Sequence, residues 1–589
     1  MSGKAGAVHV VRVRKTHVDR HGERRDYQSA YLRRTFREGG KVRNETVANL
    51  SALPGHVVDW VEAGLKGKSL VPAEEAATIT RSVPHGHVAA VWAQAVALGL
   101  PGLLGPAGRH RDLAVALIVS RVVRPGSKLA TATWWDDTTL GGDLGVAGAS
   151  TDEVYAAMDW LLGRQDPIQA ELAKRHLAEQ ANPSRMALFD LSSSWLEGSH
   201  CPLAKRGYSR DGKKNRAQIE YGLLTDPAGR PVAIKVFPGN TADPTAFLDA
   251  VKIVRDRFGL TRLVMVGDRG MITSARIAAI RADTESSLGW LTALPAPAIK
   301  TLAAQGGPLQ PTLFDQQNLA EITHPDYPDE RLIACRNPFL AAERARKRGE
   351  LLQATEDTLA PVIAAVTAGR LTGADQIGLK VGQIINTYKM AKHFEVSITD
   401  TGLAIRRKTT QIQTEAALDG IYVLRTSVPA DTLDAAGVVG AYKKNLAHVE
   451  RDFRSIKVDD LDLRPIYHRL EDRVRAHVLI VMLAAYLTWH LRKTLAPLTF
   501  TDPTPPNRTD PVAPATRSTA AARKASRRTD QAGQPVRSFR TLLDHLATLT
   551  RNDIQYGPDG PIVPTLAMPT PTQRHAFELL NTTIPLKLK

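Results

Sequence analysis

The chain contains 589 residues, with 77 Lys and Arg against 60 Asp and Glu, so its formal net charge is +17. Hydrophobic residues make up 43% of it, which is enough for at least one large core and excludes a disordered polymer. The two cysteines, Cys201 and Cys335, are too few for a disulfide framework or a cysteine-based zinc module. A reducing, cytosolic setting is therefore the default, and the length predicts about four structural units at roughly 150 residues each.

No secretory or membrane segment is predicted. Residues 1–15 are basic and lack the apolar stretch of a signal peptide. The longest apolar run, residues 478–489, is too short to span a bilayer and is flanked by Arg475, His477 and His490. The excess of positive charge leaves phosphate-bearing polymers as the leading class of partner.

The first 183 residues are predicted to hold two candidates for DNA binding. Residues 1–85 form a small basic β-rich unit, because alternating valines precede a turn and a stretch in which aromatic residues alternate with arginines. Residues 1–45 carry twelve basic and five acidic residues, a local balance of +7, although a solvated basic face explains this equally well. Residues 86–183 are predicted to form a helical domain, since apolar residues recur there at helical spacing.

From residue 184 the pattern changes to that of an α/β fold. Residues 184–294 are predicted as the first part of a ribonuclease-H-like core, with three antiparallel strands followed by helix, strand, helix and strand. The predicted strands are 186–191, 219–224, 232–237, 263–266 and 288–294, and the predicted helices are 244–258 and 274–281.

The second half of the chain interrupts and then completes this core. Residues 295–418 do not continue the rhythm and are predicted as an insertion subdomain, with a charged helix at 339–359. The core resumes over 419–495 with a strand and two strong helices, 434–457 and 470–491. Seven prolines and eight basic residues then predict a disordered cationic linker over 496–540, before a C-terminal tail at 541–589.

Two aspartates follow apolar runs at comparable positions of this pattern. Asp190 follows Ala187-Leu188-Phe189, and Asp268 follows residues 263–266. The ends of neighbouring strands meet at one edge of a sheet, so the two carboxylates are expected to converge. Two clustered carboxylates repel each other unless a cation neutralises them, which favours Mg²⁺ or Mn²⁺. Taken singly, each is more typical of an ordinary strand-end turn than of a functional site.

A third acid, Glu450, lies on the helix predicted at 434–457. The apolar stripe of this helix is Leu446, Val449, Phe453 and Ile456. A second, adjacent stripe consists of Lys443, Glu450, Arg454 and Lys457. One acid among three cations on a single face suits a site that holds both metal and DNA phosphate, although a surface ladder of salt bridges has the same pattern.

A basic stretch between the first two core strands supplies further candidates for DNA contacts. It has Tyr208 in its middle and Arg216 at its end. The candidates are Lys205, Arg206, Arg210, Lys213 and Lys214.

Seven stretches of the sequence carry a family likeness as a set, although each alone is weakly specific. They are YLRRTFREGGKVRNETVANL (31–50), ALFDLSSSWLEG (187–198), KVFPGNTADPTAF (235–247), LVMVGDRGMIT (263–273), DGIYVLRT (419–426), YKKNLAHVERDFRSIK (442–457) and RPIYHRLEDRVRAHVLIVMLAAYL (464–487). The set covers about residues 10–490 and resembles the DDE transposases of bacterial insertion sequences. More narrowly, it is similar to the group whose ribonuclease-H-like core is interrupted by a β-rich insertion between the second Asp and the Glu.

The resemblance implies roles for individual residues. Asp190, Asp268 and Glu450 look like the metal-binding catalytic triad, which would hold two Mg²⁺ or Mn²⁺ ions. Tyr442 and Lys457 resemble the outer members of a Tyr-Arg-Glu-Lys signature that contacts DNA phosphate. The spacing of seven positions from Glu450 to Lys457 matches that signature. The spacing of eight positions from Tyr442 to Glu450 does not match it.

Two other features of the family pattern are absent from this sequence. Leu446 occupies the usual Arg position, which leaves Lys443 or Arg454 to supply the missing charge. Relatives that form hairpins hold a flipped base against a Trp of the insertion. No Trp occurs between 295 and 418, so this role is not assigned.

The function implied by the resemblance is that of a bacterial, cytoplasmic, nucleoid-associated DNA transposase. Such an enzyme binds terminal inverted repeats as a homodimer, hydrolyses phosphodiesters with metal-activated water and joins the freed 3′-OH ends to target DNA. Two alternatives stay open, because a fold does not by itself determine a function. One is a DNA-binding regulator that has lost catalysis, and the other is a structure-specific nuclease on the same fold.

Overall fold

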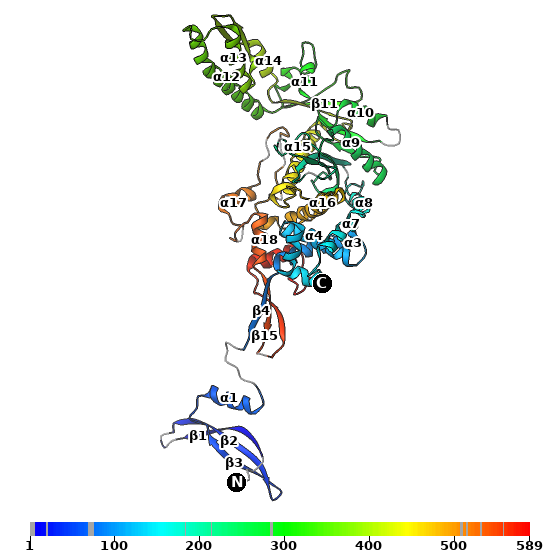
Figure 1. Cartoon of the computed structure of the whole chain (residues 1–589). Coiled ribbons are helices and arrows are strands. Elements are labelled where there is room, and N and C mark those ends of the chain that lie inside the picture. The colour runs from blue at the N-terminus through cyan, green and yellow to red at the C-terminus, as the bar shows by residue number, and fades with distance from the viewer. Residues whose placement is uncertain are drawn as a thin grey trace. The chain divides into compact units, whose positions relative to one another are not determined.

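A computed structural model describes the chain except for residues 1–5, 19, 21, 69–75, 183, 199, 214, 283–286, 503, 507–509, 514–515, 531–532 and 558. The chain divides into two compact units (Figure 1). The first consists of Met1–Ser82 and Arg551–Ala567, and the second of Val83–Thr550 and Met568–Lys589.

The first unit is built from two small antiparallel sheets. One has the order β1 (Ala7–Val18), β2 (Arg24–Glu38), β3 (Lys41–Asn49), and helix α1 (Gly55–Leu65) packs against β1. Arg12 of β1 forms ion pairs with Asp59 and Glu62 of α1. In the other sheet, β15 (Thr550–Gln555) lies between β4 (Thr78–Pro84) and β16 (Ile562–Leu566), so the C-terminal part of the chain completes a sheet begun near the N-terminus.

The second unit begins with helices that pack around a buried central helix. They are α2 (Gly86–Ala97), α3 (Leu100–Leu104), α4 (Arg109–Val123), α5 (Lys128–Asp136), α6 (Thr139–Leu144), α7 (Thr151–Leu162) and α8 (Gln165–His176). α7 starts where a capping box is formed, since Ser150 accepts from the backbone of Glu153 and the Glu153 side chain accepts from the backbone of Ser150. Helices α2, α4 and α7 all contact α16 (Glu471–Thr494).

The central sheet confirms the predicted α/β class with a ribonuclease-H-like core. Its first five strands in the chain are β5 (Met186–Trp195), β6 (Gln218–Thr225), β7 (Pro231–Pro238), β8 (Val264–Val266) and β9 (Gly289–Ala293). Their spatial order is β9-β8-β5-β6-β7, with β5, β6 and β7 antiparallel and β5, β8 and β9 parallel. The helices α9 (Asp243–Lys252) and α10 (Ser274–Arg281) connect the later strands.

The insertion extends this sheet and is mainly helical, so the predicted β-rich character of the insertion is wrong. Strands β14 (Ile421–Thr426), β11 (Arg331–Arg336) and β10 (Leu319–Ile322) add antiparallel to β9 and complete an eight-stranded sheet. The rest consists of α11 (Ala296–Leu302), α12 (Pro338–Thr367), α13 (Ala374–Tyr388), α14 (Thr409–Ala416) and the hairpin β12 (Phe394–Ile398)–β13 (Leu403–Arg407).

Local sequence explains the helical insertion. α12 is 30 residues long and rich in Ala, Glu, Arg and Leu, which favour helices. The side chain of Asn337 caps it by accepting from the N–H groups of Phe339 and Leu340. On α13, Ile377, Val381 and Ile385 are spaced four residues apart and are buried in one apolar cluster with residues of α12.

Two long helices complete the core. α15 (Ala435–Arg454) lies against the central sheet and contacts β5, β9, β10 and β11. α16 is the one helix, among the described residues, that is long and apolar enough to cross a membrane by length and composition. However, 83% of its apolar window is buried inside the structure, as expected for the core helix of a globular domain.

The segment 496–540 is ordered in its described residues, so the predicted disordered linker is wrong. It contains α17 (Thr519–Arg527), and the next helices are α18 (Phe539–Ala547) and α19 (Pro571–Leu579). The ammonium group of Lys524 donates to the carbonyls of Ala496 (2.8 Å) and Thr499 (3.1 Å), and Val512 is fully buried. In a disordered linker the basic side chains would be solvated, whereas here the Lys524 ammonium group binds main-chain carbonyls.

Candidate active site

Asp190 and Asp268 lie at the same level of two neighbouring strands. β5 and β8 run parallel, and their last paired residues are Leu188 and Val266. Asp190 and Asp268 each follow that pair by two residues. β5 continues to Trp195, so Asp190 lies within its strand and not at the predicted strand end, whereas Asp268 lies in the loop after β8.

The electrostatics of this aspartate pair (Asp190 and Asp268) show that the two carboxyl groups interact. Burial is the main cause that raises the pKa of Asp190 to about 7, and the charge of Asp268 raises it further. The N–H of Leu191 donates to Asp190 (2.8 Å) and opposes this rise. Asp268 Oδ1 accepts from the N–H groups of Gly270 (2.5 Å) and Met271 (3.2 Å), which orients its carboxylate.

Helix α15 covers the sheet face that carries Asp190. The ring of Phe453 lies 5.9 Å from that of Tyr221 on β6, and the Tyr221 hydroxyl lies 3.1 Å from Ser194 Oγ. Ser194 is on the same face of β5 as Asp190, since side chains alternate along a strand. Burial raises the pKa of Tyr442, and both members of the aspartate pair raise it further. Tyr442 on α15 therefore lies within electrostatic range of both aspartates.

The structure does not gather Glu450 with the aspartate pair into a metal-holding group. Glu450 is exposed on α15. Around the axis of α15 it is rotated by about 80° from Tyr442. Within the part of the chain that the structure describes, no three His, Cys, Asp or Glu side chains form a cluster able to hold a metal ion. The two aspartates fit a divalent cation, because both offer oxygen ligands and one is a buried carboxyl beside a second carboxylate.

A family comparison decides what kind of domain surrounds these residues. The family model for the transposase DDE domain matches residues 192–487, half of the 589-residue chain. The chain belongs to the DDE transposase family. The match includes Asp268, Tyr442 and Glu450, and it begins two residues after Asp190.

The other comparisons find only distant similarity. Six chains in solved structures match. One is a piggyBac transposase in a cryo-EM synaptic complex with hairpin DNA, with 9% sequence identity and a TM-score of 0.31. That match covers 74% of this chain and 70% of the piggyBac chain. The search of curated proteins found no match.

Arg210 of the DDE transposase takes part in an ionic cluster next to the aspartate pair. Its guanidinium pairs with Asp243 (2.5 Å) and Glu220 (3.4 Å), and the backbone N–H of Arg210 donates to Ser193 Oγ (3.0 Å). Burial raises the pKa of Glu220 to about 7, and the charge of Arg210 lowers the pKa of Asp190. Two acids hold the arginine in place. Ser193 and its strand partner Glu220 face the opposite side of the sheet from Asp190, because side chains alternate along β5 and β6, so the charge of Arg210 acts on Asp190 at longer range.

Sequence reasoning missed the two acids of this cluster. Glu220 is the one charged residue in the buried strand β6, where every residue is buried, and a lone charge in an apolar strand is a signal that could have been used. Asp243 is the first residue of α9, and its carboxylate holds Arg210. Neither residue carries a motif of its own.

The other members of the basic loop (residues 196–217) lie mostly at the surface. Lys205 and Arg206 are exposed, and the backbone of Lys205 pairs with that of Gln218. Lys213 is exposed, with its ammonium group 5.5 Å from the centre of the Trp195 ring. Lys214 lies outside the described residues.

The cations predicted on α15 differ in how far they are already engaged within the DDE transposase. The ammonium group of Lys443 donates to the carbonyl of Val512 (2.6 Å). Lys457 is buried and donates to Asp211 Oδ1 (2.8 Å), with Arg464 pairing with the same carboxylate. Arg454 is exposed. The structure thus leaves Arg454 at the surface and holds Lys443 and Lys457 in internal contacts.

Proposed function

We propose that this protein is an active DNA transposase. It binds the terminal inverted repeats of an insertion sequence, cleaves DNA strands there and joins the 3′-OH ends to target DNA. The observation that carries the proposal is the aspartate pair, which the parallel register of β5 and β8 places at one level of the ribonuclease-H-like sheet. Two copies of the chain would act together, one for each end of the mobile element.

The aspartate pair would hold Mg²⁺ or Mn²⁺, with two ions shared among Asp190, Asp268 and Glu450. When bound, such ions activate water as the nucleophile and stabilise the leaving oxygen of the phosphodiester. Support comes from the oxygen-only donor set of the aspartate pair and from the burial and neighbouring Asp268 charge that together raise the pKa of Asp190. Glu450 is included in the proposed metal site because the family likeness assigns it as the third acid and because it lies on α15.

The chain's own residues position the DNA around this centre. The hydroxyl of Tyr442 would donate a hydrogen bond to a phosphate oxygen beside the aspartate pair. Arg210, held by Asp243 and Glu220, would stabilise negative charge on the phosphoryl group that reacts. The exposed cations Lys205, Arg206, Lys213 and Arg454 would contact the DNA backbone further from the cleaved bond.

A cleavage assay on duplex DNA that carries the flanks of the native gene locus tests this proposal. With Mg²⁺, we expect Asp190→Ala, Asp268→Ala and Glu450→Ala each to lower strand cleavage by at least about a hundredfold. Binding of the same duplex without metal should stay close to that of the wild type. Matched controls are Asp315→Ala and Glu395→Ala, which remove exposed acids of the insertion. An alanine variant with normal cleavage would remove that residue from the proposed site.

The regulator without catalysis is favoured by one observation. The described residues contain no group of three His, Cys, Asp or Glu side chains able to hold a metal ion. A wild-type chain that binds the flanking DNA but neither nicks nor joins it would support this alternative. Cleavage without joining of ends to a target would instead support a nuclease.

A further inference from the structure

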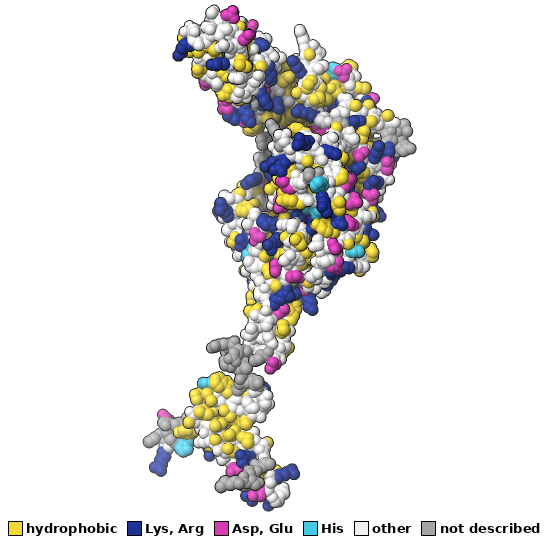
Figure 2. Space-filling view, viewed as in Figure 1, with side chains coloured by type: hydrophobic (Ala, Val, Ile, Leu, Met, Phe, Trp, Pro, Cys, Tyr) yellow, Lys and Arg dark blue, Asp and Glu magenta, His cyan; other side chains and the backbone are white. Residues whose placement is uncertain are grey.

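A large basic cleft lies within the insertion, next to the start of β14. Its volume is about 1000 Å³, and its walls come from α11, the first half of α12, the turn after α13, and α14. Figure 2 shows Lys and Arg side chains gathered over this part of the molecule. The cations that line this insertion cleft are Lys300, Arg344, Lys347, Arg348, Lys389 and Lys392.

Internal ion pairs compensate half of these cations. Arg348 and Asp419 form a largely buried pair that ties α12 to the residues before β14. Lys392 donates to Glu415 of α14 (2.7 Å). Lys347 lies 3.2 Å from Glu343 on the same helix. These contacts fix the walls of the cleft and use both acids that line it.

The other three cations are not neutralised within the chain. Lys300, Arg344 and Lys389 are exposed, and none of them forms an ion pair with an acid among the described residues. They come from three different elements, namely α11, α12 and the residue that follows α13. Like charges brought into one cleft repel each other, so an anionic partner would be bound there favourably.

The way in which the three cations are distributed along the cleft favours a polyanion over a small anion as the ligand. The three cations are exposed and are spread along a wide, open cleft, whereas a site for a single phosphate gathers buried donors around one point. A row of exposed Lys and Arg side chains along a groove is the arrangement that follows a nucleic-acid backbone. Contacts of this kind are made to phosphates and do not read the base sequence.

We infer that the insertion cleft binds the phosphodiester backbone of duplex DNA through Lys300, Arg344 and Lys389. The inference rests on the proposed function, which makes DNA the substrate, and it assigns a second DNA surface apart from the aspartate pair. The DNA in the cleft comes either from the element's own end or from the target.

The test compares two triple variants of the full chain that change charge equally. Lys300→Gln/Arg344→Gln/Lys389→Gln removes the unpaired cations of the cleft. Arg370→Gln/Lys380→Gln/Arg406→Gln removes three exposed cations of the same insertion that do not line the cleft. Each is titrated with labelled duplex DNA over a range of salt concentrations in EDTA.

For the cleft variant, we expect binding at moderate salt to weaken by about tenfold or more. The slope of log affinity against log salt should become shallower by up to about 2.7, since each phosphate contact contributes about 0.9. The matched control should retain the wild-type slope. A third variant, Lys300→Arg/Arg344→Lys/Lys389→Arg, should also retain it, because the charges remain. Equal binding by the cleft variant and the control, or equal loss in the charge-preserving variant, would overturn the inference.

Two DNA probes identify the source of the strand. Weakening confined to a duplex with the flanks of the native locus assigns the cleft to the element's end, and weakening confined to a random-sequence duplex assigns it to the target. EDTA prevents cleavage during the binding measurement. The proposal of transposase activity and the proposal of DNA binding in the insertion cleft can therefore be refuted independently. A wild type that never cleaves would refute transposition while the cleft could still bind DNA, and active cleavage with an unaffected cleft variant would refute the cleft alone.

Discussion

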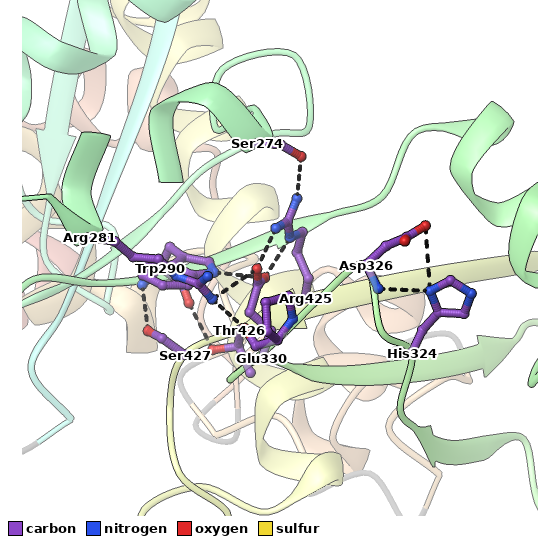
Figure 3. Close-up of polar contacts among 10 residues, drawn as sticks. Ser274, Arg281, Trp290, His324, Asp326, Glu330, Arg425, Thr426 and Ser427 are labelled. Carbon is purple, nitrogen blue, oxygen red and sulfur yellow. Dashed lines mark hydrogen bonds and ion pairs between the residues drawn. The ribbon is translucent and has the colours of Figure 1, made fainter. Parts of the chain in front are cut away.

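Arg425 of β14 and Glu330 form a bidentate ion pair in the interior, with side chains only 6% and 2% exposed (Figure 3). The two N···O distances are 2.6 and 2.5 Å. Trp290 of β9 donates its indole N–H to the same carboxylate (3.1 Å), and Arg425 also donates to Ser274 at the start of α10 (2.8 Å). The pair therefore fastens the strand that returns from the insertion to the core strands beside the aspartate pair.

Removal of one partner of this pair should destabilise the protein strongly. Glu330→Ala leaves the Arg425 guanidinium buried and uncompensated, for which we expect a loss of about 3–5 kcal/mol in the free energy of unfolding. Chemical denaturation measures it. Glu343→Ala, which breaks the exposed pair with Arg346, is the control and should cost less than about 1 kcal/mol. Similar losses for the two variants would show that the buried pair is not a structural anchor.

Replacing a glycine of the central sheet with alanine should also lower the stability of the fold. A Cβ added at Gly222 of β6 would overlap the ring of Phe189 on β5 and would lie 3.4 Å from Phe237. Gly222→Ala should therefore cost about 1–3 kcal/mol through overpacking. Gly102→Ala on α3 has no atom within 4 Å of the added carbon and should be neutral or stabilising by up to about 1 kcal/mol. Thermal unfolding of both variants checks the contrast.

The core of the fold could be predicted because its signals are local. Residues 226–230 mark the turn of a hairpin between two apolar runs, and the structure has β6 and β7 there. The first strand is predicted to end at residue 191, but β5 continues through Ser192, Ser193 and Ser194 to Trp195. The three serines are buried in β5, where Ser194 satisfies its hydroxyl with Tyr221, a partner that the sequence alone does not reveal.

Other features depend on contacts between distant segments. The β-rich insertion was inferred from a family likeness, whereas the local pattern at 339–359 already indicated a helix. The composition of 496–540 is that of a disordered linker, but Lys524 and the residues around Val512 find partners only once the core has formed. For the site, strand patterns placed Asp190 and Asp268 together. The holding of Arg210 by Glu220 could not be read from spacing.

Arg210 offers a prediction on catalysis. Arg210→Ala removes the positive charge beside Asp190 and leaves Glu220 and Asp243 without their partner. We expect cleavage under single-turnover conditions to fall by about a hundredfold or more. Arg210→Lys keeps a charge but loses the geometry that pairs with two acids, so it should recover only part of the rate. Full activity of Arg210→Ala at unchanged stability would exclude a role for this guanidinium in the reaction.

The last prediction concerns pH and His176 at the end of α8. Its Nδ1 accepts from Arg230, so its Nε2 carries the proton and donates to the Tyr486 hydroxyl (3.0 Å). Burial, with Arg230 and Arg175, lowers the pKa of His176 from 6.5 to about 4, and burial also lowers the pKa of the neighbouring His490 to about 3.

Because the folded pKa of His176 lies below the unfolded value, the unfolded chain binds more protons between these two pH values. The stability contributed by the neutral ring is therefore complete above about pH 6.5 and is lost as the pH falls towards about 4. His176→Gln cannot be protonated, so its midpoint of thermal unfolding should fall less than that of the wild type over this range. The reference variant is His110→Gln, an exposed histidine, which should follow the wild type. Parallel curves for wild type and His176→Gln would show that this imidazole does not contribute to the acid sensitivity of the fold.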